Sequence, residues 1–154
     1  MKKKFKELVL NLVKLHNTPP EIALGVAIGV FIAIVPLYGF HTIMVIIAAI
    51  MVRRANKVAI LVGTNISIPP TLPFITWTGY DIGRLVLGNH YPTLEWSFFK
   101  NVSIQKVADF YLPLFLGSLV LGLIMSVVFY FITLASIKII RKRRAKKRAM
   151  SQEE

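Results

Sequence analysis

The stretch GTNISIPPTLPF, residues 63–74, decides how the rest of the chain is interpreted. It places Pro69 and Pro70 side by side, with Pro73 three residues further on, between two apolar runs. Proline has no backbone N–H and clashes with the preceding helical turn, so one regular helix does not pass through this stretch. The whole chain is 55% hydrophobic with a mean hydropathy of +0.64, which is unusual for a soluble domain. The break therefore interrupts apolar segments that belong in a bilayer.

A second break lies earlier in the chain. Thr18 followed by Glu21 forms a capping box, which predicts a helix over 19–35 that ends at the turn PLYGF. Three further helices are expected, at 41–52, at 57–67 after a capping Asn56, and at 74–88. At 1.5 Å per residue, the second and third of these are roughly 18 Å and 16 Å long, against about 30 Å of hydrocarbon.

Neither short helix crosses a membrane alone. We therefore expect an all-α membrane protein whose core, residues 18–88, consists of two proline-broken, re-entrant-like helical hairpins packed together. The residues expected to break the helices are Pro36, Gly39, Pro69 and Pro70.

The ends of the chain carry most of its charge. The net charge is +12, with five basic residues in 2–14 and eight in 138–148. Apolar residues of 1–17 recur at helical spacing, which predicts an amphipathic interfacial helix. Residues 110–137 lack charge and predict a transmembrane helix, while 138–154 predict a basic cytoplasmic tail. Residues 89–109 are expected to form an interfacial connector.

Basic residues beside apolar segments mark the cytoplasmic side of a membrane protein and attract anionic lipids. A nucleic-acid interface is not expected, because the tail lacks interleaved aromatic residues and a folded reading module. The topology stays open at this point. A cytoplasmic tail requires an odd number of crossings before Phe110 if the amino terminus is also cytoplasmic, so one hairpin, most simply the second, has to span.

The residues from 18 to 88 resemble the bacterial membrane family catalogued as domain of unknown function 2062, in its Ile-Pro-Pro branch. The resemblance rests on a patterned set of positions: Pro20, Ala23-Leu24-Gly25, Gly29-Val30-Phe31, Pro36 to His41, Arg54, Asn56, Pro69-Pro70 and Gly83. Many relatives have Asn-Pro where this chain has Ile68-Pro69, and Gln where it has His41. Some relatives are fused to glycosyltransferases that use lipid carriers, so the resemblance implies work on the cell envelope or on polyprenyl lipids in the bacterial inner membrane.

Polar residues near the two breaks are the candidates for binding. Helix ends at a break can aim backbone amides at an anionic headgroup, and arginine binds phosphate with two hydrogen bonds. The same side chains could instead satisfy the backbone freed at each break, or mark the interface. The predicted lipid-phosphate-binding residues are His41, Arg54, Asn65, Thr71 and Arg84.

Other chemistry is not predicted. The sequence has no cysteine, and its three histidines lack acidic partners at ligand spacing, so neither a metal nor another cofactor is expected. A phosphate loop and a serine elbow are also lacking, so the chain is not expected to be an enzyme.

Two functions remain. The first is a polyprenyl-phosphate flippase or recycling transporter, because paired interrupted segments point to a site at mid-membrane. Such a small chain is then expected to form a homo-oligomer. The alternative is a scaffold that anchors a glycosyltransferase or another envelope enzyme without transporting anything.

Overall fold

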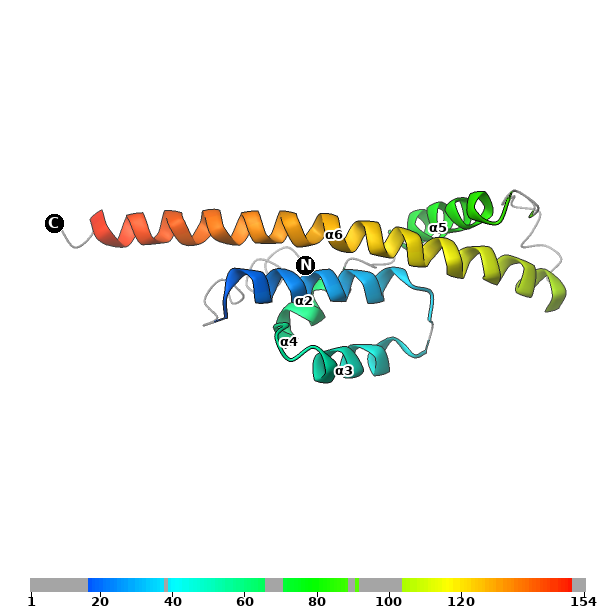
Figure 1. Cartoon of the computed structure of the whole chain (residues 1–154), viewed down its shortest axis with the longest axis horizontal. Coiled ribbons are helices and arrows are strands. Elements are labelled where there is room, and N and C mark those ends of the chain that lie inside the picture. The colour runs from blue at the N-terminus through cyan, green and yellow to red at the C-terminus, as the bar shows by residue number, and fades with distance from the viewer. Residues whose placement is uncertain (1–16, 38, 66–70, 89–90, 92–103, 151–154) are drawn as a thin grey trace.

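The computed structural model describes residues 17–37, 39–65, 71–88, 91 and 104–150, and in these ranges it contains five helices and no strand. The helices are α2 (Pro19–Ile34), α3 (His41–Met51), α4 (Lys57–Thr64), α5 (Leu72–Val86) and α6 (Ile104–Met150) (Figure 1). The predicted amphipathic helix at 1–17 and the breaks Pro69 and Pro70 fall almost wholly outside the described residues. The expected all-helical class is confirmed for the part that is described.

The amino terminus of α2 follows the predicted capping box. The side-chain oxygen of Glu21 accepts a hydrogen bond from the backbone N–H of Thr18 at 3.0 Å, and Pro19 occupies the first helical turn. At the other end, the chain leaves the helix at Val35, and Pro36 cannot continue it. A turn then closes through a 3.1 Å hydrogen bond from the N–H of Phe40 to the carbonyl of Leu37.

Gly39 allows this turn to form. Its φ of +88° lies in the left-handed region that residues with a Cβ rarely adopt. The predicted break at Pro36 and Gly39 therefore has a direct physical cause in the backbone, and α3 begins two residues later, at His41.

Close contact between backbones joins α2 to α4. Gly25 lies against the carbonyl of Asn56, and Gly29 lies against the carbonyl of Ile60 and the Cα of Gly63. A Cβ on either glycine would come within 3.0 Å of these atoms. Small residues four apart permit this kind of helix contact in apolar surroundings.

Glycines also bring the backbones of α5 and α6 into close contact. Gly83 lies against the carbonyl of Pro113, and Gly117 lies against the backbone of Gly79 and Gly83. The side chain of Tyr80 is buried beside these glycines and stacks on Phe110 at a centroid distance of 5.1 Å. Helix α5 is therefore attached mainly to the first half of the described length of α6 (Figure 1).

Two helical hairpins packed together were expected, and the described residues show an antiparallel pair only where the first was placed. Helices α2 and α3 form an antiparallel pair around the turn at 35–40 (Figure 1), although α3 has no buried residue. Helices α4 and α5 do not pack as a hairpin, because α4 packs on α2 whereas α5 packs on α6. The physical reason is that Gly63 of α4 lies against α2, whereas Gly79 and Gly83 of α5 lie against α6.

Helix α6 is the longest element. The stretch 109–146 contains a run that is apolar and long enough to cross a membrane, and within the described residues no other helix meets that test. The sequence placed the end of the helix at 137, but the helix continues through the basic residues to Met150. These residues, 138–146, are called the basic end of α6 below.

The helices run along α6 in defined directions. Arg141 donates to the carbonyl of Asn17 at 2.7 Å, whereas the hydroxyl of Tyr111 donates to the carbonyl of Pro36 at 3.0 Å. Helix α2 therefore runs antiparallel to α6, starting at the basic end. Helix α4 also starts at that end, since the N–H of Asn56 donates to the carbonyl of Glu21 at 3.1 Å. Helix α5 then continues away from the basic end, so that α4 and α5 occupy successive levels along α6.

Candidate functional site: a cavity where the broken helices meet

A cluster of polar side chains fixes the helices at the basic end. The side-chain amide of Asn56 donates to the side-chain oxygen of Asn17 at 2.8 Å, and its own oxygen accepts from the N–H of Ala59 at 2.9 Å. Asn17 in turn donates to Glu21 at 3.0 Å. Asn56 is 7% exposed, so its hydrogen bonds replace those it would otherwise make to water. These four residues (Asn17, Glu21, Asn56, Arg141) are called the polar cluster below. Their hydrogen bonds fix how α2 and α4 are placed along the axis of α6.

The Glu21 carboxylate is stabilised in its charged form. The side-chain amide of Asn17 and, next, the backbone N–H of Thr18 both donate to it, and they lower the pKa of Glu21. The carboxylate is therefore ionised throughout the neutral range, which suits its place at the positive end of the helix dipole.

At the other end of α2 there is a cavity of about 260 Å³. It lies where α2 and α4 end and where α3 and α5 begin, and one wall comes from α6. Four lining side chains carry polar groups: His41, Thr64, Thr76 and Ser118. The remaining lining residues are apolar or glycine, as expected for a site next to a helix that is a candidate to cross the membrane.

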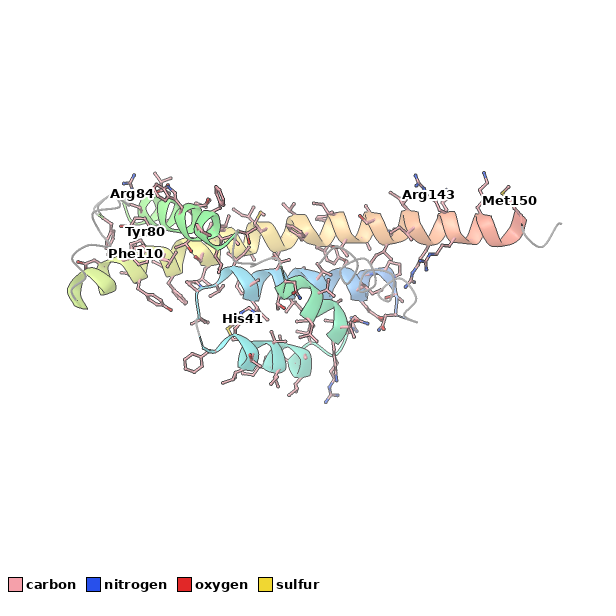
Figure 2. The ribbon with its side chains drawn as sticks, turned by 180° about the vertical axis from the view of Figure 1, so that it is seen from behind. His41, Tyr80, Arg84, Phe110, Arg143 and Met150 are labelled. Atoms are coloured by element: carbon pink, nitrogen blue, oxygen red, sulfur yellow. The ribbon has the colours of Figure 1, made fainter. Side chains whose placement is uncertain are left out.

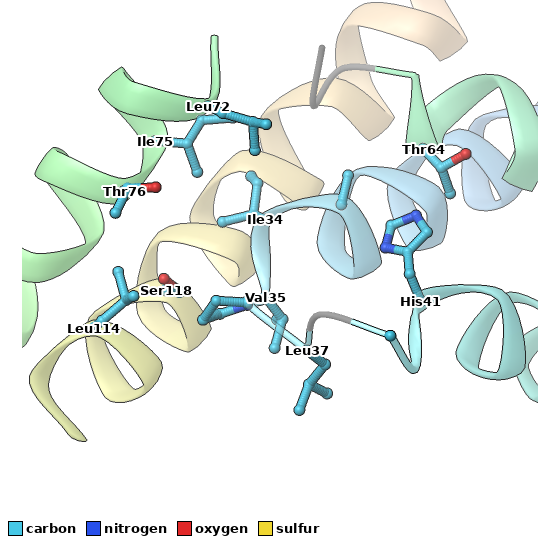
Figure 3. A pocket seen from close by; sticks show the side chains of 13 residues that line it. Ile34, Val35, Leu37, His41, Thr64, Leu72, Ile75, Thr76, Leu114 and Ser118 are labelled. Atoms are coloured by element: carbon cyan, nitrogen blue, oxygen red, sulfur yellow. The ribbon is translucent and has the colours of Figure 1, made fainter. Parts of the chain in front are cut away.

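The polar groups face each other across this cavity. In Figure 3 the ring of His41 points toward Thr64, while Thr76 and Ser118 lie on the opposite side, on α5 and α6. Neither α3 nor α5 has a side-chain hydrogen bond capping its amino terminus. The first backbone N–H groups of such helices are donors without intrahelical partners, and the helix dipole adds partial positive charge there.

The structure brings only some of the predicted binding residues to this cavity. His41 lines it, and Thr71 directly precedes Leu72, which also lines it. Asn65 follows Thr64 but is exposed, and its side chain donates to the carbonyl of Leu61 at 2.8 Å. Asn65 thus satisfies the end of its own helix in this structure, as does Thr64, whose hydroxyl donates to the same carbonyl at 2.8 Å.

The two predicted arginines lie elsewhere. Arg54 is exposed in the turn between α3 and α4, two residues before Asn56, and so belongs to the level of the polar cluster. Arg84 lies twelve residues beyond Leu72 on α5, which is about 18 Å along the helix. Figure 2 shows it near Tyr80 and Phe110, away from His41. The Nε of Arg84 is buried and has no hydrogen-bond partner among the described residues.

Three polar residues of the cavity are not among the predicted binding residues: Thr64, Thr76 and Ser118. Thr76 follows the proline break by one helical turn, and Ser118 sits in the uncharged run that predicts the transmembrane helix. The adjacent small residues Gly117 and Ser118 were an available signal, because small residues in such helices mark close packing. Their partner, Gly79, could not be identified without the fold.

The described residues contain no group of three histidine, cysteine or acidic side chains that could hold a metal. What the geometry provides is different: hydrogen-bond donors at two helix ends and four small or titratable polar groups. This arrangement suits an anionic oxygen-rich group better than a metal ion.

The fold thus defines a helical protein with one candidate membrane-crossing helix and a cavity between broken helices. The sequence profile of a bacterial family described as "Uncharacterized protein conserved in bacteria (DUF2062)" matches residues 2–146, and the chain belongs to that family. No curated protein and no solved structure matches the chain. The match covers more of the chain than the 18–88 over which the resemblance was traced.

Proposed function

We propose that the chain is an integral protein of the bacterial inner membrane that binds the phosphate group of a membrane lipid in the cavity between its broken helices. The observation that carries this proposal is the meeting of two uncapped helix amino termini, those of α3 and α5, with His41 at one cavity. Oriented N–H groups and a helix dipole bind phosphate without requiring a lysine or arginine.

The two predicted arginines lie on either side of the cavity along α6, where each could bind the same phosphate group. Arg54 lies at the level of the polar cluster, and Arg84 lies toward the opposite end of α5. A headgroup that moves from one interface to the other would meet Arg54, the cavity and Arg84 in turn. The buried, unpaired Nε of Arg84 is a donor that a phosphate oxygen would satisfy.

Flipping or recycling of a polyprenyl phosphate is the most concrete form of this function. The cargo carries a small charged group on a long apolar chain, so the protein has to shelter only the headgroup. A cavity of about 260 Å³ is of the size needed to shelter a phosphate group. We propose that chains associate as homo-oligomers to complete the path.

The proposal is tested with protein purified in mild detergent and with polyprenyl phosphate added. Native mass spectrometry should detect the lipid in fixed ratio to the chain, and His41→Ala should lower its retention by roughly tenfold, equivalent to the loss of one charge-assisted hydrogen bond. Thr42→Ala is the matched control, because Thr42 is exposed on the next position of α3. Equal retention by both variants would reject the cavity as the binding site.

A second candidate function is a membrane scaffold for a glycosyltransferase or another envelope enzyme. One observation favours it: α3 buries none of its residues and exposes large apolar side chains, among them Ile46, Ile50 and Met51. Under this alternative, transport of polyprenyl phosphate by reconstituted vesicles is no faster than in empty vesicles. A partner enzyme would then lose membrane attachment when Ile46 and Ile50 are replaced by Ser.

A further inference from the structure

A second hollow lies on a different part of the molecule. It is a groove of about 560 Å³ between α2 and α6, and its walls are almost entirely apolar. Helix α2 contributes Leu24, Ala27, Ile28 and Phe31, and α6 contributes Leu123, Ser126, Val127, Tyr130 and Phe131. Within the groove, the hydroxyl of Ser126 donates to the carbonyl of Leu123 at 2.8 Å, so that polar group is already satisfied.

Basic side chains follow this groove along α6. Lys138 lies seven residues after Phe131, which places it on nearly the same helix face about 10 Å closer to the basic end. Lys142 lies one turn further along that face, and both lysines are exposed. Apolar walls therefore lead to a pair of positive charges near the expected membrane surface.

The charges need a partner that this chain does not provide in its described part. The described carboxylates are Glu21, Asp81 and Asp109. Glu21 is engaged by Asn17 and Thr18, and the other two lie toward the opposite end of α6. A second copy of the chain carries the same net charge of +12 and is therefore a poor partner for these lysines.

We propose that this groove binds one anionic phospholipid, with an acyl chain between α2 and α6 and its phosphate beside Lys138 and Lys142. The groove opens sideways on the helix that is able to cross the membrane, so a lipid reaches it without leaving the bilayer. A lysine near a membrane surface contributes about 1 kcal/mol to binding of anionic lipid. This site is separate from the cavity at His41 and does not depend on the proposed transport.

The test uses the full chain reconstituted in phosphatidylcholine vesicles with a small amount of phosphatidylglycerol that carries a nitroxide on one acyl chain. Electron paramagnetic resonance should show a motionally restricted component, stronger than the one seen with nitroxide-labelled phosphatidylcholine. Lys138→Gln should lower the preference for phosphatidylglycerol roughly fivefold. Arg143→Gln should leave it unchanged, because Arg143 is a third of a turn around the helix from Phe131 and points away from α2 (Figure 2).

A second pair of variants tests the groove itself. Ser126→Phe fills it and should remove the excess restricted component seen with phosphatidylglycerol, whereas Ser136→Phe places the same ring at an exposed position of α6 away from the groove and should leave that excess unchanged. Equal spectra for these two variants, or equal effects of Lys138→Gln and Arg143→Gln, would overturn the proposal. So would efficient disulfide formation between two copies of Ser126→Cys, since the chain has no other cysteine and the groove would then hold a second copy.

Discussion

At the scale of single residues, glycine determines which helices touch. Gly29 brings the backbone of α2 against Gly63, and Gly83 brings α5 against Pro113. Ridges of larger side chains would hold the helix axes further apart. The sequence showed the spacing of the glycines. It did not show which helix each glycine would contact, because that depends on how all the helices pack together.

Gly29→Ala should lower stability by about 1–3 kcal/mol, because the added methyl group overlaps the carbonyl of Ile60 and the Cα of Gly63. Thermal unfolding in detergent, followed by circular dichroism, measures the shift. Ala135→Leu is a control on the exposed surface of α6 and should leave the midpoint unchanged. A Gly29→Ala protein as stable as the unmodified chain would show that α2 and α4 are not in close contact.

The pH dependence of stability follows from Glu21. Its pKa is lower in the folded chain than in the unfolded chain, because Asn17 and the N–H of Thr18 bind the charged form. Its contribution is therefore fully present above the unfolded pKa and is lost as the pH falls through the lower folded pKa. We expect stability to decrease below about pH 4.3.

The Glu21→Gln variant checks this assignment. It cannot ionise at this position, so its stability should decrease less steeply over the same acidic range. Denaturation curves of the two proteins at a series of pH values provide the comparison. Parallel decreases in both proteins would assign the acid sensitivity to other carboxylates.

At the scale of elements, local signals located most helices well. The capping box and Asn56 predicted two helix starts, and the observed ends lie within a few residues of those expected. The sequence did not reveal that α4 and α5 separate, since proline residues mark a break but not the angle across it. It also placed the end of α6 at the first lysine, although lysine and arginine are good helix formers.

The start of α4 depends on one side chain. Asn56→Ala removes the cap on Ala59 and the hydrogen bond to Asn17, and it should cost about 1–2 kcal/mol. Lys57→Ala, at an exposed position one residue later, should cost far less. Hydrogen exchange of the amides of α4 would show faster opening in the first variant only. Equal exchange in both would contradict a capping role.

At the scale of the whole molecule, the direction of each helix leads to a prediction for the topology that the sequence left open. Helix α2 starts at the basic end, α3 returns toward it, and α4 and α5 lead away from it on successive levels. A membrane around α6 would then be crossed once by α4 with α5 and once by α6. This places Arg54 and the basic end on the same side.

Cysteine labelling tests that topology without background, because the chain contains no cysteine. In intact cells, Arg54→Cys and Lys146→Cys should resist a membrane-impermeant maleimide that reacts from outside. Leu87→Cys, just beyond α5, should react. Labelling of Leu87→Cys and Arg54→Cys from the same side would mean that the second broken segment returns instead of crossing.

The residues of the candidate site come from several depths of the fold, which the sequence alone does not indicate. His41 and Thr71 were predicted and lie at or beside the cavity, yet Arg54 and Arg84 lie at two other levels. A list of polar residues near helix breaks does not show where each residue lies along α6. That position follows from the tertiary contacts. Ser118 was missed for the same reason, because only the fold places it opposite His41.

The most direct test of the central claim is a contact between lipid phosphorus and His41. The measurement is phosphorus-to-nitrogen dipolar recoupling by solid-state NMR, with ¹⁵N-histidine in the chain and polyprenyl phosphate as the only phosphorus in the sample. Replacing His16 and His90 by Gln leaves His41 as the single labelled ring. The proposal predicts that the ring nitrogen signals of His41 lose intensity when the phosphorus is irradiated. Unchanged signals in a sample that retains one lipid per chain would contradict binding of the phosphate in this cavity.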